Sequence, residues 1–230
     1  KKAIADSMNV CAVKTITAIT PQLGYDYLCN FGITTLVDNR VEKDGSVTSD
    51  IHQPLALGGI TDGVTNLEMT AAYATIANQG TYTRPVFYSK VVDSNGRILL
   101  DNTTPTTHTV LKSSTASLLT QGMTSVITEG TGKACALTDG MPVSGKTGTT
   151  SSAYDLWFCG YTPYLTASIW TGYDENKELG SGQAYHERLW SKIMSQIDQV
   201  KGYEVKDFEM SDDVEEVTLC SSSGALAIEG

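Results

Sequence analysis

The sequence has no long hydrophobic run and few basic residues. No stretch approaches the ~18 apolar residues of a membrane span, and no basic-then-apolar signal opens the chain. Only 16 lysines and arginines stand against 26 acidic residues, so the formal net charge is −10. Because a protein that tracks a nucleic-acid backbone needs the opposite charge, we expect no nucleic-acid partner.

Paired cysteines and clustered histidines are also missing. The five cysteines are odd in number and widely spaced without a C-x-x-C, and the three histidines are isolated from one another. These spacings indicate neither a disulfide framework nor a zinc site. We therefore expect no metal and no cofactor.

What remains is the composition of an ordinary globular protein. Its 230 residues are 40% apolar and 18% charged, which is enough for one sizeable core. The first residues already read as a helix without a start signal, so we expect the N-terminal part of the domain to be missing. Beyond Gly202 the chain becomes acidic. The sequence thus predicts a domain over residues 1–202 and an extended acidic tail over residues 203–230.

Apolar residues recur at helical spacing in several segments. Helices are predicted over residues 4–16, 21–31, 65–77, 114–130 and 189–200. The third begins at a capping box, in which Thr65 and Glu68 can each bond the other's backbone amide. Residues 37–63 are polar and glycine-rich, and they read as a long connecting loop.

Strands are predicted between these helices. Residues 86–92 and 97–100 flank Asn95-Gly96 as a hairpin, and residues 156–161 and 166–173 form a second pair. A further strand is expected over 216–220. Helices that enclose consecutive strands joined by tight turns indicate an α+β fold with an antiparallel sheet.

Lys146-Thr147-Gly148 precedes the second strand pair. A tripeptide of this kind can simply be a glycine-containing turn before a strand. At a strand edge, however, it offers a cation, a hydroxyl donor and room for close approach of a ligand backbone. A site that binds a carboxylate and polarises a carbonyl needs these groups.

Ser7-Met8-Asn9 near the start is less specific. On a continuous helix, Ser7 and Asn9 point in different directions, and the local pattern favours a solvated helix start. A shared function for the two side chains requires a loop or a helix end at that point.

The order of the two motifs carries more information than either motif alone. Ser-x-Asn followed by Lys-Thr-Gly gives the second and third signatures of the serine acyl-transfer enzymes. The sequence around these motifs resembles the class A (bifunctional) penicillin-binding proteins over nearly the whole chain. The similar segments are residues 5–13, 65–85, 129–132, 145–150, 155–163 and 168–174.

This resemblance implies a penicillin-binding protein or serine β-lactamase-like fold, with Lys-Thr-Gly on an edge strand lining the cleft. It also implies a D,D-transpeptidase that cross-links peptidoglycan stem peptides and is acylated by β-lactams at the same serine. By motif position, Ser7 relays a proton, Asn9 binds the substrate amide, and Lys146 supplies positive charge and assists the relay.

The resemblance assigns the remaining motif residues to substrate binding. The hydroxyls of Thr147 and Thr149 bind the substrate carboxylate, and the backbone amide of Thr149 forms half of the oxyanion hole. Gly148 keeps the strand slim enough for substrate to lie against it.

The chain departs from the family in one respect, because it contains no Ser-x-x-Lys. Thr109-Val110-Leu111-Lys112 has the spacing with the wrong nucleophile, and it lies between the other two motifs. In the family the nucleophile comes upstream of Ser-x-Asn, as do the glycosyltransferase domain and the membrane anchor. We expect an extracytoplasmic protein at the cell envelope, and a chain that is inactive without its upstream part.

Two other functions stay open. The first is a D,D-carboxypeptidase or β-lactamase of the same fold, although no Glu-x-x-Leu-Asn-like segment is present to activate a deacylating water. The second is a non-catalytic, penicillin-binding-like module used for binding or scaffolding. Retention of Ser7, Asn9 and Lys146 favours an enzyme over such a module.

Overall fold

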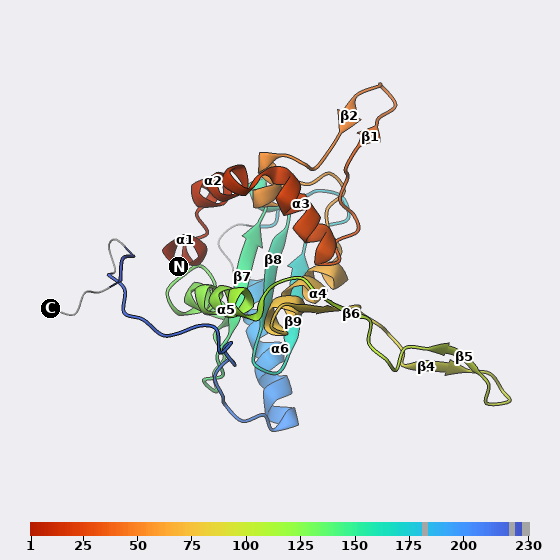
Figure 1. The fold of residues 1–230 in the computed structure, drawn as a ribbon, viewed down its shortest axis with the longest axis vertical. Helices are drawn as coiled ribbons and strands as arrows, with labels where there is room; N and C mark the ends of the chain where they lie inside the picture. The colour runs from red at the N-terminus through yellow and green to blue at the C-terminus, as the bar shows by residue number, and fades with distance from the viewer. Residues whose placement is uncertain (181–183, 221–223, 227–230) are drawn as a thin grey trace.

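The computed structural model describes residues 1–180, 184–220 and 224–226, and a three-stranded antiparallel sheet lies at its centre (Figure 1). The strands are β7 (Ser144–Thr149), β8 (Leu156–Tyr161) and β9 (Thr166–Thr171), paired in the order β7-β8-β9. Within the described residues β7 pairs with β8 alone, so it is an edge strand. The α+β fold class and the edge position of Lys-Thr-Gly predicted from the sequence are confirmed.

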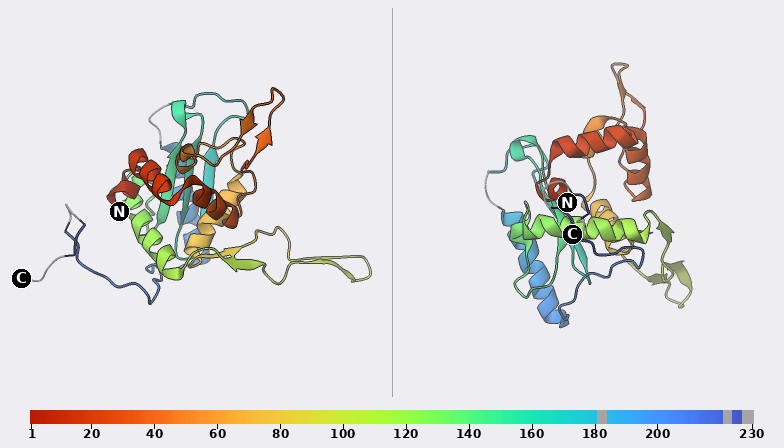
Figure 2. Two further views of the ribbon diagram at one scale, coloured as in Figure 1. Left: turned by 45° about the horizontal axis from the view of Figure 1, so that its top comes forward. Right: turned by 60° about the vertical axis from the view of Figure 1, so that its left-hand side comes forward.

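Helices cover both faces of this sheet because side chains alternate along β8. On one face, Phe158 packs edge-on against Trp190 of α6 (Tyr185–Lys201), with ring centroids 4.8 Å apart. On the other face, the Tyr161 hydroxyl lies 2.7 Å from Thr120 Oγ1 of α5 (Ser113–Thr128). Figure 2 shows α6 and α5 on opposite sides of the strands.

The first predicted helix is interrupted, and this corrects the sequence interpretation. Two helices, α1 (Lys2–Ala5) and α2 (Asn9–Ile19), meet at a break. Ser7 takes a left-handed φ of 53°, its N–H donates to Ile4 O, and the Met8 N–H donates to Ala3 O. These paired bonds form a Schellman end, which satisfies the last carbonyls of α1 and turns the chain. Apolar periodicity continues through the break and therefore hid it.

Four other helices and one hairpin form where the sequence predicts them. They are α3 (Pro21–Asn30), α4 (Asn66–Ala77), α5, α6 and the hairpin of β4 (Lys90–Val92) with β5 (Ile98–Asp101). The hairpin strands are shorter than predicted and project from the body of the molecule (Figure 1). Among the described residues, no helix is long and apolar enough to cross a membrane.

The predicted loop 37–63 contains structure that its polar composition concealed. It forms a short hairpin of β1 (Arg40–Val41) with β2 (Val47–Thr48), and a 3₁₀ helix η1 (Gln53–Leu57). Further short elements that the sequence did not reveal are β3 (Thr81–Thr83) paired with β6 (Thr107–Thr109), and the 3₁₀ helices η2 (Lys133–Cys135) and η3 (Ser151–Ala153).

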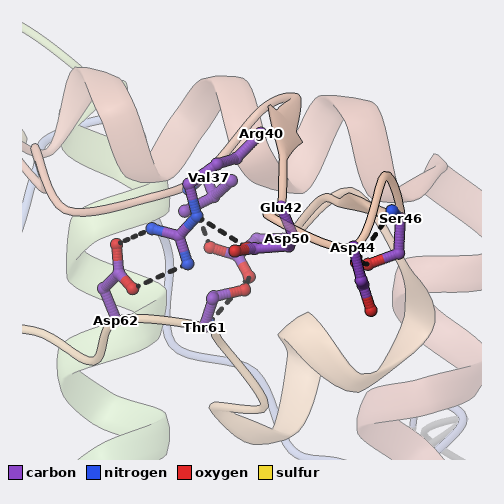
Figure 3. A network of polar contacts seen from close by, with 8 residues as sticks. All are labelled: Val37, Arg40, Glu42, Asp44, Ser46, Asp50, Thr61 and Asp62. Atoms are coloured by element: carbon purple, nitrogen blue, oxygen red, sulfur yellow. Dashed lines mark hydrogen bonds and ion pairs between the residues drawn. The ribbon is translucent and has the colours of Figure 1, made fainter.

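A buried carboxylate ties the two ends of this segment together (Figure 3). Asp50 is fully buried and accepts hydrogen bonds from Val37 N at 2.8 Å, Thr61 N at 2.8 Å and Thr61 Oγ1 at 2.7 Å. Arg40 makes a bidentate contact with Asp62 at 2.7 and 3.1 Å. Burial alone raises the pKa of Asp50, but these hydrogen bonds outweigh it and leave the pKa lowered. The carboxylate thus fixes both ends of the segment that carries η1.

The acidic tail is joined to the domain at its start. Tyr203 stacks on Tyr164 with centroids 4.2 Å apart, Phe208 meets Tyr161 edge-on, and Ser211 N donates to Ser117 Oγ at 2.9 Å. The strand predicted over 216–220 is wrong, because Leu219 and Leu226 form only an isolated bridge. Residues 221–223 and 227–230 of the predicted tail lie outside the described residues.

The capping box of α4 is confirmed and extends to a second segment. The Glu68 carboxylate accepts hydrogen bonds from Thr65 N and Oγ1 at 3.1 and 2.9 Å, and from Thr34 N and Oγ1 at 2.9 and 2.6 Å. Partial burial raises the pKa of Glu68, but these four donors outweigh it and the pKa is lowered. The carboxylate thus fastens the segment after α3 to the start of α4.

We predict that Glu68→Gln lowers the free energy of unfolding by about 1–2 kcal/mol at pH 7, because a neutral amide offers one acceptor oxygen to four donors. A lowered folded-state pKa gives stability that is present above the unfolded pKa and lost as pH falls through the folded one. The difference from wild type should therefore shrink on acidification. Urea denaturation at several pH values measures it. The exposed Glu175→Gln is the matched control, and an equal loss there would contradict the prediction.

Candidate active site

The side chain of Lys146 links the sheet to the break between α1 and α2. Its Nζ donates to Ser7 Oγ at 2.8 Å and to the Thr147 carbonyl at 2.9 Å. Burial lowers the pKa of Lys146, so this amine gives up its proton more readily than an exposed lysine. An amine with a lowered pKa at hydrogen-bond distance from a hydroxyl can exchange a proton with it.

Ser7 owes its position to backbone strain. A non-glycine residue with φ of 53° is uncommon, and such conformations persist only where the surroundings enforce them. Here the hydrogen bonds that end α1 and the bond from Thr131 N to the Ala5 carbonyl together hold it, and the resulting turn aims the Ser7 hydroxyl at Lys146. The helix end that a shared role of Ser7 and Asn9 requires is therefore present.

Asn9 is exposed at the first position of α2, two residues beyond the break. Its side-chain amide makes no hydrogen bond to another residue in the part of the chain that the structure describes. An amide group offers both a donor and an acceptor, so Asn9 is available to a ligand that lies beside Ser7.

Thr147, Gly148 and Thr149 continue along the edge strand. Thr147 Oγ1 lies 2.7 Å from Thr131 Oγ1, whereas Thr149 is exposed at the end of β7. An added Cβ at Gly148 would lie 3.2 Å from the Cβ of Trp157, which is tight packing against the next strand. The open edge of β7 is where a peptide-like ligand can pair with the sheet.

All six residues that the sequence predicts for the site line one cavity of about 750 Å³. A second cavity of about 720 Å³ adjoins it, and Lys146, Thr147, Gly148 and Thr149 line both. The rest of the lining is mostly apolar. Its large apolar side chains include those of Ile16, Leu28, Leu55, Leu57, Met69, Tyr73, Trp157 and Trp170.

Thr131 is a site contact that sequence reasoning missed. The segment Glu129-Gly130-Thr131-Gly132 stood out only for its similarity to a family, and nothing in its spacing showed that it touches Thr147. The contact arises because α5 packs against β7, so that the turn after α5 places Thr131 beside Thr147.

These features agree with what comparison of the sequence shows. The model of the penicillin-binding protein transpeptidase domain matches residues 1–195. The chain belongs to this family. Ser7-Met8-Asn9 and Lys146-Thr147-Gly148 both lie within the matched residues.

The curated relatives described here are penicillin-binding proteins of the 1A and 1A/1B types. Penicillin-binding protein 1A of Clostridium acetobutylicum is 35% identical over 194 residues, covering 84% of this chain and 23% of that protein. Penicillin-binding protein 1A/1B of Bacillus subtilis is 30% identical and covers 99% of this chain and 25% of that protein. The chain thus spans about a quarter of the length of these curated relatives and resembles part of their transpeptidase domain.

Solved structures agree on the fold. Penicillin-binding protein 1A from Haemophilus influenzae superimposes with a TM-score of 0.76 at 21% identity, covering 99% of this chain and 38% of that chain. PonA1 from Mycobacterium tuberculosis in complex with penicillin V gives a TM-score of 0.61 at 26% identity, covering 79% and 50%.

Proposed function

We propose that this chain is the C-terminal part of a peptidoglycan D,D-transpeptidase that works by serine acyl transfer. The observation that carries the proposal is the 2.8 Å contact between Lys146 Nζ and Ser7 Oγ. It joins the second and third motifs across 139 residues of sequence, inside a cavity that all six motif residues line. A structural lysine would not need a strained serine as its partner.

We assign a role to each of the six residues from its position in its motif. Lys146 and Ser7 pass a proton to and from the reacting groups, and Asn9 binds the amide of the stem peptide. Thr147 and Thr149 bind its terminal carboxylate, Gly148 lets the peptide lie against β7, and the Thr149 amide contributes to the oxyanion hole. One oxyanion donor of this type is typically worth a factor of ~10²–10³ in rate.

The nucleophile comes from a Ser-x-x-Lys segment upstream of residue 1 in the longer protein. The apolar walls on either side of Lys146 support this idea, because they offer packing surface for a segment that would place a serine near the amine. Trp170 is 38% exposed there, as expected for a surface that a further segment covers. The chain without that segment is inactive, since covalent catalysis needs the nucleophile.

The same proposal covers partners, location and domain limits. The partners are the stem peptide, β-lactams and the upstream part of the same protein, and the membrane is reached only through an upstream anchor. The protein acts at the cell envelope, outside the cytoplasm. Residues 1–202 form the C-terminal portion of the transpeptidase domain, and residues 203–230 form its tail.

Labelling with a fluorescent penicillin tests the function. This chain and a polypeptide extended upstream through the Ser-x-x-Lys segment are compared by denaturing gel and intact mass. We expect an adduct only in the extended form, mapped by peptide digestion to the upstream serine, and abolished by replacing that serine with alanine. If the folded, extended form takes no label, the acyl-transfer assignment is wrong and a non-catalytic binding module is the better interpretation.

A further inference from the structure

The turn between α5 and η2 contacts both the break at Ser7 and the edge strand β7. The Thr131 N–H donates to the Ala5 carbonyl at 3.1 Å, two residues before Ser7. The Thr131 hydroxyl lies 2.7 Å from the hydroxyl of Thr147 on β7. One residue therefore contacts the Ser7 break through its backbone and the edge strand through its side chain.

The backbone contact between this turn and α1 leaves no room for a residue larger than glycine at position 130. Gly130 lies so close to α1 that an added Cβ would stand 2.3 Å from the Ala5 carbonyl oxygen and 2.9 Å from Val126 Cα. Ala5 itself is only 2% exposed, so it cannot move aside. Glycine at position 130 thus allows the turn to approach α1 and places Thr131 beside β7.

The contact between the Thr131 and Thr147 hydroxyls decides whether Thr147 can donate a hydrogen bond to a ligand. A hydroxyl has one proton and two acceptor lone pairs. If Thr147 donates to Thr131, its proton is used inside the protein. If Thr131 donates to Thr147, the Thr147 proton is left for a ligand in the cavity that both Thr147 and Lys146 line.

The charges nearby favour the second arrangement when an anion is bound. As an ammonium, Lys146 Nζ can only donate, and it lies 3.5 Å from Thr147 Oγ1, so it also makes that oxygen an acceptor. An anionic ligand can only accept, so it requires the Thr147 proton. Thr131 completes a chain of donors that runs toward the ligand.

We propose that Thr131 is a positioning residue that orients the Thr147 hydroxyl as a donor and thereby selects ligands with a free carboxylate beside β7. This inference rests on the proposed function, because it needs a ligand that acylates the protein. It adds to that function a determinant of specificity that lies outside the two motifs.

The test compares Thr131→Val with Thr131→Ser in the extended polypeptide, using benzylpenicillin and its methyl ester as probes. Acylation rate constants are measured by intact mass. Valine removes the hydroxyl at nearly constant shape, so we expect an acylation rate about 10-fold lower with benzylpenicillin and a change under about 2-fold with the ester. Serine keeps the hydroxyl and should restore the rate. Thermal unfolding confirms that each variant is folded.

The possible outcomes separate the two proposals. Equal losses with acid and ester, or no loss with either, would overturn the role of Thr131 while leaving the acyl transfer intact. Absence of any adduct in the unsubstituted, extended protein would overturn the proposed function, and the inference with it.

Discussion

Replacing Lys146 by alanine in the extended polypeptide should slow its acylation by penicillin about 10²–10⁴-fold, the usual contribution of a positioned proton-transfer group. The amine is 2.8 Å from Ser7 Oγ, and burial lowers its pKa. Both features are needed for an amine that carries protons at neutral pH. The rate constant is measured with fluorescent penicillin in quenched time courses.

Arginine at the same position separates charge from proton transfer. A guanidinium keeps the positive charge but does not deprotonate in proteins, so Lys146→Arg should remain slow if the lysine passes a proton. The wild-type rate should rise with pH through the lowered pKa of Lys146, and the arginine variant should lack that limb. Recovery of the full rate by arginine would mean that Lys146 acts only through its charge.

The sequence contained enough information to predict most of the helices and the antiparallel strands and to nominate six candidate site residues, but not how these parts assemble. Local signals sufficed for α4, because Thr65 and Glu68 are three residues apart and cap each other directly. Hairpin chemistry sufficed for β8 and β9. The family resemblance then supplied the edge position of Lys146, which no local pattern reveals.

The break at Ser7 shows why other features escaped prediction. The Schellman bonds that end α1 are backbone bonds, and serine is not a residue that marks a left-handed turn. The surrounding contacts, above all those of Gly130 and Thr131 with Ala5, stabilise a conformation that Ser7 would avoid by itself. Long-range packing decided this point, so the periodicity of residues 4–16 could not.

The second large effect concerns stability rather than chemistry. Phe158 is fully buried on the face of β8 opposite the cavity, edge-on to Trp190 and within a cluster that includes Met194. Its ring also lies over two glycines, since an added Cβ on Gly145 or Gly160 would approach that ring to 2.7 or 2.6 Å. Phe158→Ala should therefore lower the free energy of unfolding by about 3–5 kcal/mol, because backbone packed this closely cannot collapse into the space left behind.

The matched control is Phe87→Ala, the same chemical change at a side chain that is 85% exposed, which should cost less than about 0.5 kcal/mol. Both variants are compared with wild type by urea denaturation of the extended polypeptide, and similar losses in the two would contradict this account of the core.

The alternation of side chains along β8 leads to a further prediction about activity. Trp157 and Cys159 face the cavity, whereas Phe158 faces α6, so the folded fraction of Phe158→Ala should acylate at nearly the wild-type rate. A stable variant with slow acylation would instead mean that packing under the sheet positions Lys146, and that α6 belongs to the catalytic apparatus as well as to the core.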